Sequence, residues 1–171
     1  MNQTLETILT RRSTRKFLEK PIPEAELKQI VEAALCAPSG KNAQTWKFTV
    51  VTSRPMIEKL ARGIEVALNR SGYNMYQPAA LIIPSNQKES PFGKEDNACA
   101  LENIFLAAHS LGIGSVWINQ LQGICDDPVI RLVLDELQIP ADHVVYGMAA
   151  LGYSDEEPKP IKRVGEVAYI K

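Results

Sequence analysis

Apolar residues recur along the chain with two different spacings, and these divide it into helices and strands. Apolar positions three and four residues apart are typical of helices with one buried face, whereas short apolar runs beside turn residues are typical of buried strands. The pattern predicts helices at 4–9, 24–37, 55–68, 96–111 and 128–137, and strands at 47–52, 81–83, 115–118 and 144–151.

Prolines mark several ends of these segments. Pro55 and Pro128 stand in first-turn positions, where a missing N–H does not break a helical hydrogen bond, and Asp127 is placed to cap the second of these helices. Pro84 is predicted to end the second strand, and the polar segment 85–96 is predicted to be a loop.

Two segments differ from the rest in how much apolar surface they carry. Helix 96–111 is apolar almost all round, so we expect it to be buried on most sides, in a core or in a subunit interface. The tail after Asp155 has few apolar residues, and their weak alternation predicts an edge strand on this chain or on a partner. These apolar residues are Val164, Val167, Tyr169 and Ile170.

Helices that alternate with strands, without repeats or a linker, indicate an α/β or α+β sandwich. The length of 171 residues fits one domain spanning 1–171, with the residues from about 155 to 171 as a C-terminal arm.

The composition excludes several classes of protein. The 19 Lys and Arg nearly balance the 20 Asp and Glu, so the net charge of −1 gives no support for a nucleic-acid partner. The three cysteines, Cys36, Cys99 and Cys125, lack CxxC spacing and are expected to be buried free thiols. No segment resembles a signal peptide or a membrane span, so we expect a cytoplasmic protein without a membrane partner.

The familiar motifs of protein-only catalysis are missing from the sequence. It contains no serine-hydrolase, zinc-protease or nucleotide-phosphate signature, and neither histidine has a metal-ligand neighbour. We expect His109 to be a structural histidine and His143 to be exposed at the entrance of a strand. Gly112 and Gly114 form half of a dinucleotide motif, but they follow a helix. No metal site is predicted, and redox chemistry would need a cofactor.

Two polar segments are candidates for binding. The first, 11–16, combines four cations with two hydroxyls, and guanidinium forks beside hydroxyl donors suit a phosphate dianion. The alternative is a solvated charged turn. The second, 37–46, is rich in small residues, amides and hydroxyls, so its backbone can approach a ligand closely. Its alternative is a structural turn with Trp46 packed into the core.

Together with two later segments, these motifs make the chain resemble the nitroreductase family of FMN-dependent oxidoreductases. The four segments are Arg-Arg-Ser-Thr-Arg-Lys-Phe at 11–17, Ala-Pro-Ser-Gly-Lys-Asn-Ala-Gln-Thr-Trp-Lys-Phe at 37–48, Ala-Ala-His-Ser-Leu-Gly-Ile-Gly-Ser-Val-Trp-Ile at 107–118, and Ala-Ala-Leu-Gly-Tyr at 149–153 followed by Pro160 and Arg163. They occur in order over essentially the whole chain, which looks like a compact member.

The resemblance implies FMN as the cofactor and assigns residues to it. Arg11, Arg12, Ser13 and Arg15 match contacts to the phosphate and ribityl chain, and Pro38, Ser39, Gly40 and Asn42 match a loop that reaches the flavin of the other subunit. Ile118, Asn119 and Gln120 match backbone over the isoalloxazine, with an N–H facing N5. Arg163, with Lys162 beside it, matches a C-terminal cation on the phosphate, and Lys16 adds a fifth charge to this cluster.

The sequence departs from the family at the pyrimidine edge of the flavin. Many members carry a Lys in the segment before the second strand, but residues 71–77 contain no cation. A cation there stabilises the anionic reduced flavin. Either Asn74 contributes a neutral donor and the potential is lower, or another cation takes that place.

The resemblance implies an α+β three-layer sandwich, with a central and mainly antiparallel sheet flanked by helices, in an intertwined homodimer that exchanges C-terminal arms. It also implies a ping-pong enzyme that uses NAD(P)H to reduce nitroaromatics, quinones or similar conjugated acceptors, with the chemistry on FMN. The alternatives are a flavin-destroying or dehalogenating enzyme of the same fold, or a non-catalytic FMN-binding protein.

Overall fold

The computed structural model describes residues 2–156 and 161–171 and contains a five-stranded antiparallel sheet. Four strands lie in the order β1 (Trp46–Val51), β2 (Ala80–Gln87), β5 (Met148–Gly152) and β3 (Gly114–Ile118), and the short β4 (His143–Val144) extends the pairing along β2. All these strand pairs are antiparallel. The predicted strands are thus confirmed as members of one sheet.

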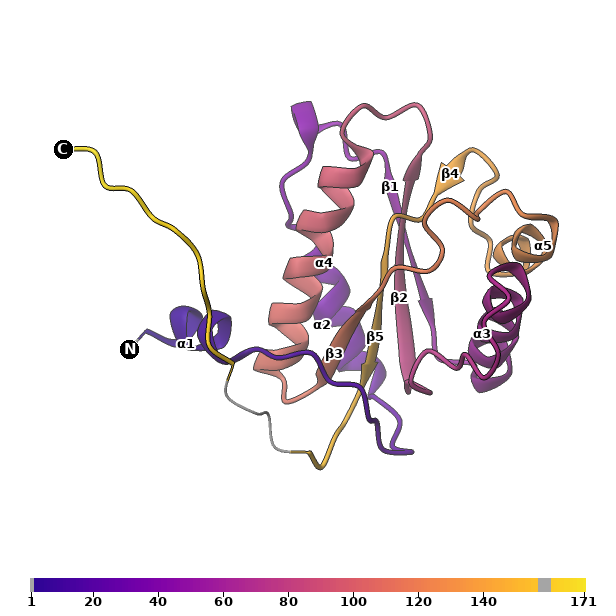
Figure 1. Cartoon of the computed structure of the whole chain (residues 1–171), viewed down its shortest axis with the longest axis horizontal. Helices are drawn as coiled ribbons and strands as arrows, with labels where there is room; N and C mark the ends of the chain where they lie inside the picture. The colour runs from indigo at the N-terminus through magenta and orange to yellow at the C-terminus, as the bar shows by residue number, and fades with distance from the viewer. Residues whose placement is uncertain (1, 157–160) are drawn as a thin grey trace.

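Helices cover both faces of the sheet (Figure 1). Helices α2 (Glu24–Leu35) and α4 (Gly93–Ser110) lie on one face, and α3 (Arg54–Ala67) and α5 (Pro128–Glu136) lie on the other. Side chains on β2 alternate between the two layers. Ala80 and Ile82 pack in the α2–α4 core, whereas Leu81 and Ile83 pack in the α3–α5 core. The structure therefore has the three layers that the resemblance implies, and its fold class is α+β.

Asp127 caps α5 as the sequence predicts. Its carboxylate accepts hydrogen bonds from the backbone N–H groups of Val129 and Ile130, at 2.9 and 3.3 Å. This cap satisfies donors that the first turn of any helix leaves without a partner.

The second strand runs further than predicted. β2 continues through Pro84 to Gln87, so the first three residues of the expected loop 85–96 are strand, and α4 begins at Gly93, three residues earlier than expected. Proline is tolerated here because β5 begins only at Met148 and pairs with β2 no further than Ile82. No strand therefore pairs with Pro84 on that side of β2.

The predicted strand 144–151 is interrupted. β4 pairs at Asn86↔Val144 and β5 at Ile82↔Ala149, so the chain advances five residues where β2 advances four. The extra residue is a β-bulge, which bends the strand and divides it into β4 and β5.

Two expectations about burial are wrong. His143 is buried because the extended β2 covers it, and its Nδ1 lies 3.0 Å from the hydroxyl of Ser85. Burial lowers the pKa of His143 below its ordinary value. Cys36 and Cys99 are exposed, whereas Cys125 is buried as expected. Over the described ranges, no cluster of three metal-ligating side chains occurs and no helix is long and apolar enough to cross a membrane.

Helix α1 and the C-terminal arm both lie on one side of the molecule, away from the sheet (Figure 1). Helix α1 (Gln3–Thr10) has no buried side chain. Residues 161–171 form no strand and are exposed throughout, with Tyr169 and Ile170 almost fully so. The prediction that this arm pairs as an edge strand on its own chain is wrong for these residues, and pairing with a partner stays a prediction.

The double-sided core predicts a large difference between two residues that face each other across β1 and β2. Ile82 is fully buried, whereas its partner Val50 is 41% exposed. We expect Ile82→Ala to lower the free energy of unfolding by about 2–4 kcal/mol because it leaves a cavity in the α2–α4 core. We expect Val50→Ala to lower it by less than about 1 kcal/mol. Urea unfolding at one fixed protein concentration measures both, and equal losses would contradict this description of the core.

Candidate functional site

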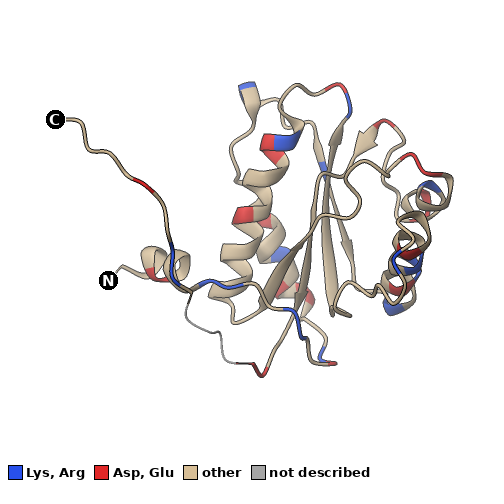
Figure 2. Ribbon diagram, viewed as in Figure 1, with Lys and Arg blue, Asp and Glu red and all other residues tan. Residues whose placement is uncertain are grey.

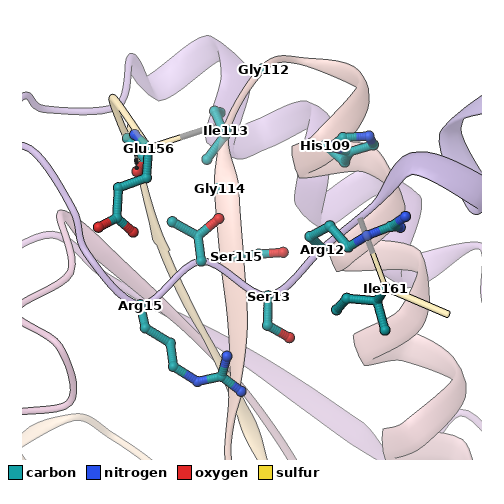
Figure 3. Close-up of a pocket in the computed structure, with 12 residues that line it drawn as sticks. Arg12, Ser13, Arg15, His109, Gly112, Ile113, Gly114, Ser115, Glu156 and Ile161 are labelled. Atoms are coloured by element: carbon teal, nitrogen blue, oxygen red, sulfur yellow. Dashed lines mark hydrogen bonds between the residues drawn. The ribbon is translucent and has the colours of Figure 1, made fainter. Parts of the chain in front are cut away.

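The basic N-terminal segment lies along the free edge of β3 (Figure 3). Ser13 and Ser115 form a parallel bridge, and the backbone N–H of Thr14 donates to the carbonyl of Ser115 at 2.9 Å. A Cβ at Gly114 would lie only 2.7 Å from the Thr14 hydroxyl. Glycine is therefore required at 114 for the segment to approach the strand this closely.

The extended backbone of this segment sends successive side chains to opposite sides. Ser13 and Arg15 extend on the same side in Figure 3, and both are exposed. In the part of the chain that the structure describes, the Arg15 guanidinium has no hydrogen-bond or ion-pair partner. A hydroxyl and an uncommitted guanidinium on one side of an exposed strand are suited to bind an oxyanion.

The other cations of the cluster have partners within the chain. Arg12 donates to the carbonyls of Leu9 and Arg11 at 2.8 and 2.7 Å, at the C-terminal end of α1. The Arg11 guanidinium lies 3.9 Å from a Glu102 carboxylate oxygen and 5.8 Å from the centre of the Phe105 ring. Arg12 therefore holds the C-terminal end of α1, and Arg11 connects that end to α4.

Lys16 lies close to two acidic side chains. Its ammonium lies 3.9 and 4.0 Å from carboxylate oxygens of Asp155 and Glu156. These acidic neighbours neutralise the charge that the sequence adds to the phosphate cluster, so the cations do not converge on one point. Figure 2 shows the basic residues spread along this segment.

A cavity of about 720 Å³ opens beside the basic segment. It is lined by Arg12, Ser13, Thr14, Arg15, His109, Gly112, Ile113, Gly114, Ser115, Ser154, Glu156 and Ile161. His109 at its wall is satisfied as predicted, because its Nε2 lies 2.8 Å from the Thr10 hydroxyl. Burial, with the charges of Arg11 and Arg12, lowers the pKa of His109. The neutral ring does not add to the positive charge of the cavity.

The C-terminal cations directly follow a residue that lines this cavity. Ile161 lines it, and the exposed Lys162 and Arg163 follow directly. Pro160, which contributes to the family resemblance, is outside the described residues. The structure thus brings the start of the arm to the same cavity as the N-terminal segment.

The loop 38–42 is held at the other end of α4. The backbone N–H of Gly40 donates to a carboxylate oxygen of Asp96 at 2.8 Å, and Asp96 is 97% buried. Lys41 and Asn42 have left-handed backbone angles, with φ of 54° and 55°. Such angles in non-glycine residues persist only where the surroundings impose them, which is frequent at binding sites.

Polar side chains further fix this loop. The Ser39 hydroxyl accepts a hydrogen bond from the backbone N–H of Gln44 at 3.2 Å, and the Asn42 amide oxygen accepts one from the Gln44 amide at 2.8 Å. Pro38 precedes them and is exposed. The structural-turn alternative therefore explains part of the segment, but it does not explain the exposed polar surface that remains.

The basic segment and the loop cannot meet within one chain. Asp96, which holds the loop, and His109, which lines the cavity, are thirteen residues apart on α4. At a rise of about 1.5 Å per residue, they are separated by about 20 Å. Within one chain the two segments therefore lie near opposite ends of α4.

The third predicted group lies at the end of β3 that is opposite the basic segment. Ile118 is buried, whereas Asn119 is exposed and Gln120 half-buried. Ser115 and Asn119 are four residues apart along an extended strand, about 13 Å. An elongated ligand with an anionic end and a planar end can therefore lie along β3.

Asn74 lies in a strained turn near this end of β3. Its side-chain oxygen accepts a hydrogen bond from the backbone N–H of Tyr76 at 3.0 Å. Met75, Tyr76 and Gln77 are three consecutive left-handed residues, with φ of 52°, 64° and 51°. Tyr73, at the start of the turn, donates from its hydroxyl to the Gln120 side-chain oxygen at 2.9 Å, so Asn74 is tethered close to 119–120.

Sequence reasoning missed the residues that hold these segments in place. Asp96 looks like an ordinary first-turn acid of a helix, and Tyr73 looks like a surface aromatic. Only the tertiary contacts show that each anchors a segment distant in sequence. For the close contact between Thr14 and Gly114, the presence of a glycine at position 114 was the one indication in the sequence.

Comparisons with known proteins identify the family of the chain. Residues 8–153 match the model of the Nitroreductase family. The chain is 40% identical to a nitroreductase with bound FMN from Bacteroides fragilis, with a TM-score of 0.91 over 100% of this chain and 98% of that one. It is 30% identical to an NADPH-flavin oxidoreductase from Vibrio harveyi over 93% of this chain and 69% of that protein.

A protein from Archaeoglobus fulgidus that carries the provisional name NADH dehydrogenase/NAD(P)H nitroreductase is 33% identical, over 92% of this chain and 88% of that protein. The family match and these whole-length similarities agree with the order of the motifs and with the three-layer fold. The chain therefore belongs to the nitroreductase family.

Proposed function

We propose that the protein is an FMN-dependent oxidoreductase that uses NAD(P)H to reduce nitroaromatic, quinone or similar conjugated acceptors. The observation that carries this proposal is the pair of exposed sites at the two ends of β3. Ser13 and Arg15 offer an anion site at one end, and the exposed Asn119 and half-buried Gln120 lie at the other. The nitroreductase, flavin oxidoreductase and FMN reductase names of its relatives support the same activity.

The residues present fit FMN. An uncommitted guanidinium at Arg15 and the hydroxyl of Ser13 suit the phosphate, and the cavity beside them admits a phosphate with its sugar-like chain. Arg11 and Arg12 add positive potential while they hold the end of α1 in place. Lys162 and Arg163 are proposed to close the phosphate site from the arm.

At the other end of the site, Ile118, Asn119, Gln120 and Asn74 are proposed to contact the ring system. When bound, FMN would supply the two-electron redox chemistry of a ping-pong cycle between NAD(P)H and the acceptor. The protein orients the ring, shields one of its faces and donates hydrogen bonds at its polar edge. With no cation at 71–77, Asn74 offers that edge a neutral donor.

We further propose a homodimer in which each site is shared. The loop of Pro38, Ser39, Gly40 and Asn42 is about 20 Å from the basic segment of its own chain, so it is proposed to reach the flavin of the other subunit. The exposed apolar side chains of α1 and of the arm, including Ile8 and Tyr169, supply surface for the partner.

On this proposal residues 1–171 form one FMN-binding domain, with the residues from about 155 as an arm to the partner. The exposed free thiols of Cys36 and Cys99 support a reducing, cytoplasmic location.

The activity is tested by loading the protein with FMN and mixing it in a stopped-flow instrument with NADH and NADPH separately. We expect one FMN per chain, loss of the flavin absorbance with at least one nucleotide, and its return when a quinone or nitroaromatic is added. A protein that binds no FMN would contradict the proposal. Stoichiometric FMN that no nucleotide reduces would indicate a binding protein instead, and fragmentation of the reduced flavin in oxygen would indicate a flavin-destroying enzyme.

The anion site predicts different effects for two adjacent cations. Arg15→Gln removes the uncommitted guanidinium, and we expect the dissociation constant for FMN to rise about 10- to 100-fold, as for loss of a charge-assisted hydrogen bond. Lys16→Gln removes the same formal charge from a side chain that faces Asp155 and Glu156. We expect less than a threefold rise in the dissociation constant. Fluorescence titration of the apoprotein measures both, and equal effects would contradict the assignment.

The shared site predicts complementation between two damaged chains. An Arg15→Gln chain and a Ser39→Ala/Asn42→Ala chain would each form homodimers with two defective sites. A mixed dimer would have one site with both defects and one with neither, so we expect co-expression to restore native FMN affinity to half of the sites in the mixed dimers, which is about a quarter of all sites when the two chains pair at random. If each chain built its whole site alone, every site in the mixed dimer would be defective, and no native affinity would return.

A further inference from the structure

A hydrogen bond between Tyr73 and Gln120 joins two segments that are far apart in the sequence. The Tyr73 hydroxyl lies 2.9 Å from the side-chain oxygen of Gln120. Tyr73 begins the strained turn that contains Asn74, and Gln120 is the second residue after the end of β3. The proposed function places both segments against the ring of FMN.

The side-chain oxygen of Gln120 accepts a second hydrogen bond, from the backbone N–H of Asn119 at 3.1 Å. A carbonyl oxygen has two lone pairs, so these two donors saturate it and fix the side chain. The same contact occupies the N–H of Asn119. The backbone N–H of Gln120 has no partner within the described residues, which leaves it as the free donor of this segment.

Tyr73 is itself held firmly. Its half-buried ring packs against the α3–α5 core, and the guanidinium of Arg70 lies 5.3 Å from the centre of the ring. Burial raises the pKa of Tyr73 above its ordinary value. The hydroxyl therefore remains protonated and able to donate at neutral pH.

We propose that Tyr73 is a positioning residue that, through the side chain of Gln120, aims the free backbone N–H of Gln120 at the reacting edge of the flavin. This inference rests on the proposed function. It explains why a half-buried hydroxyl is directed at a side chain in the segment proposed to contact the ring. It also explains why the backbone N–H of Asn119 donates to the Gln120 side chain and is not available to a ligand.

Tyr73→Phe tests the proposal, with Tyr76→Phe as the matched control. Tyr76 lies in the same turn and is 41% exposed, and its hydroxyl makes no hydrogen bond within the described ranges. We expect Tyr73→Phe to slow flavin reduction by the preferred nucleotide about tenfold, because small misplacements of a donor reduce rates strongly. We expect the dissociation constant for FMN and the melting temperature to change little. Tyr76→Phe should leave all three at their native values.

A double-mutant cycle with Gln120→Ala separates positioning from a direct role. If Tyr73 acts through Gln120, Tyr73→Phe has no further effect on the reduction rate in the Gln120→Ala background. A full tenfold loss in that background would overturn the proposal. Equal reduction rates in Tyr73→Phe and the native protein would also overturn it, provided that the native protein binds FMN and is reduced.

A readout in the FMN-free protein makes the test independent of activity. We expect Tyr73→Phe to shift the amide NMR resonances of Asn119 and Gln120, and Tyr76→Phe to leave them in place. Unchanged resonances would show that the hydrogen bond does not hold this segment, and would overturn the inference. A native protein that binds no FMN would overturn the proposed function, and the inference with it.

Discussion

Burial of β2 on both faces is the constraint on which the architecture depends. Residues 80–86 are all buried, and successive side chains enter different helical layers. Both layers are therefore needed to remove this strand from water. β5 and β1 occupy the two sides of β2, which leaves β3 at the edge of the sheet. The basic segment attaches to that edge through the bond from Thr14 to Ser115, so the place of the candidate site follows from the order of the strands.

Most of the elements could be predicted because they depend on local patterns. The apolar repeat that predicts α3 and the Asp127–Pro128 pair that predicts the start of α5 depend only on residues close together in the sequence. The structure confirms both helices. The errors have non-local causes. β2 continues past Pro84 because the neighbouring strand ends there, and His143 is buried because β2 extends over it. No window of sequence around either residue contains that information.

The candidate site was predictable in its composition and less so in its contacts. A cluster of cations and hydroxyls at 11–16 indicates an anion site, but the sequence does not show that Arg12 is bonded to the end of α1 or that Lys16 faces two acids. These roles depend on the side to which each residue points once the segment lies on β3. Tyr73 and Asp96 were missed for the same reason, because each acts on a partner at least 47 residues away.

The length of α4 has a consequence for the thermodynamics of the protein. In the proposed shared site, a ligand contacts one end of α4 in one chain and the other end, about 20 Å away along that helix, in its partner, so it binds to an assembly rather than to a chain. Cofactor binding and association then share one coupling free energy, and each strengthens the other by the same factor. Dilution would weaken the hold on the cofactor, and saturation with the cofactor would oppose dissociation of the subunits. A single rigid helix would thereby make the occupancy of a redox cofactor depend on how much of the protein is present.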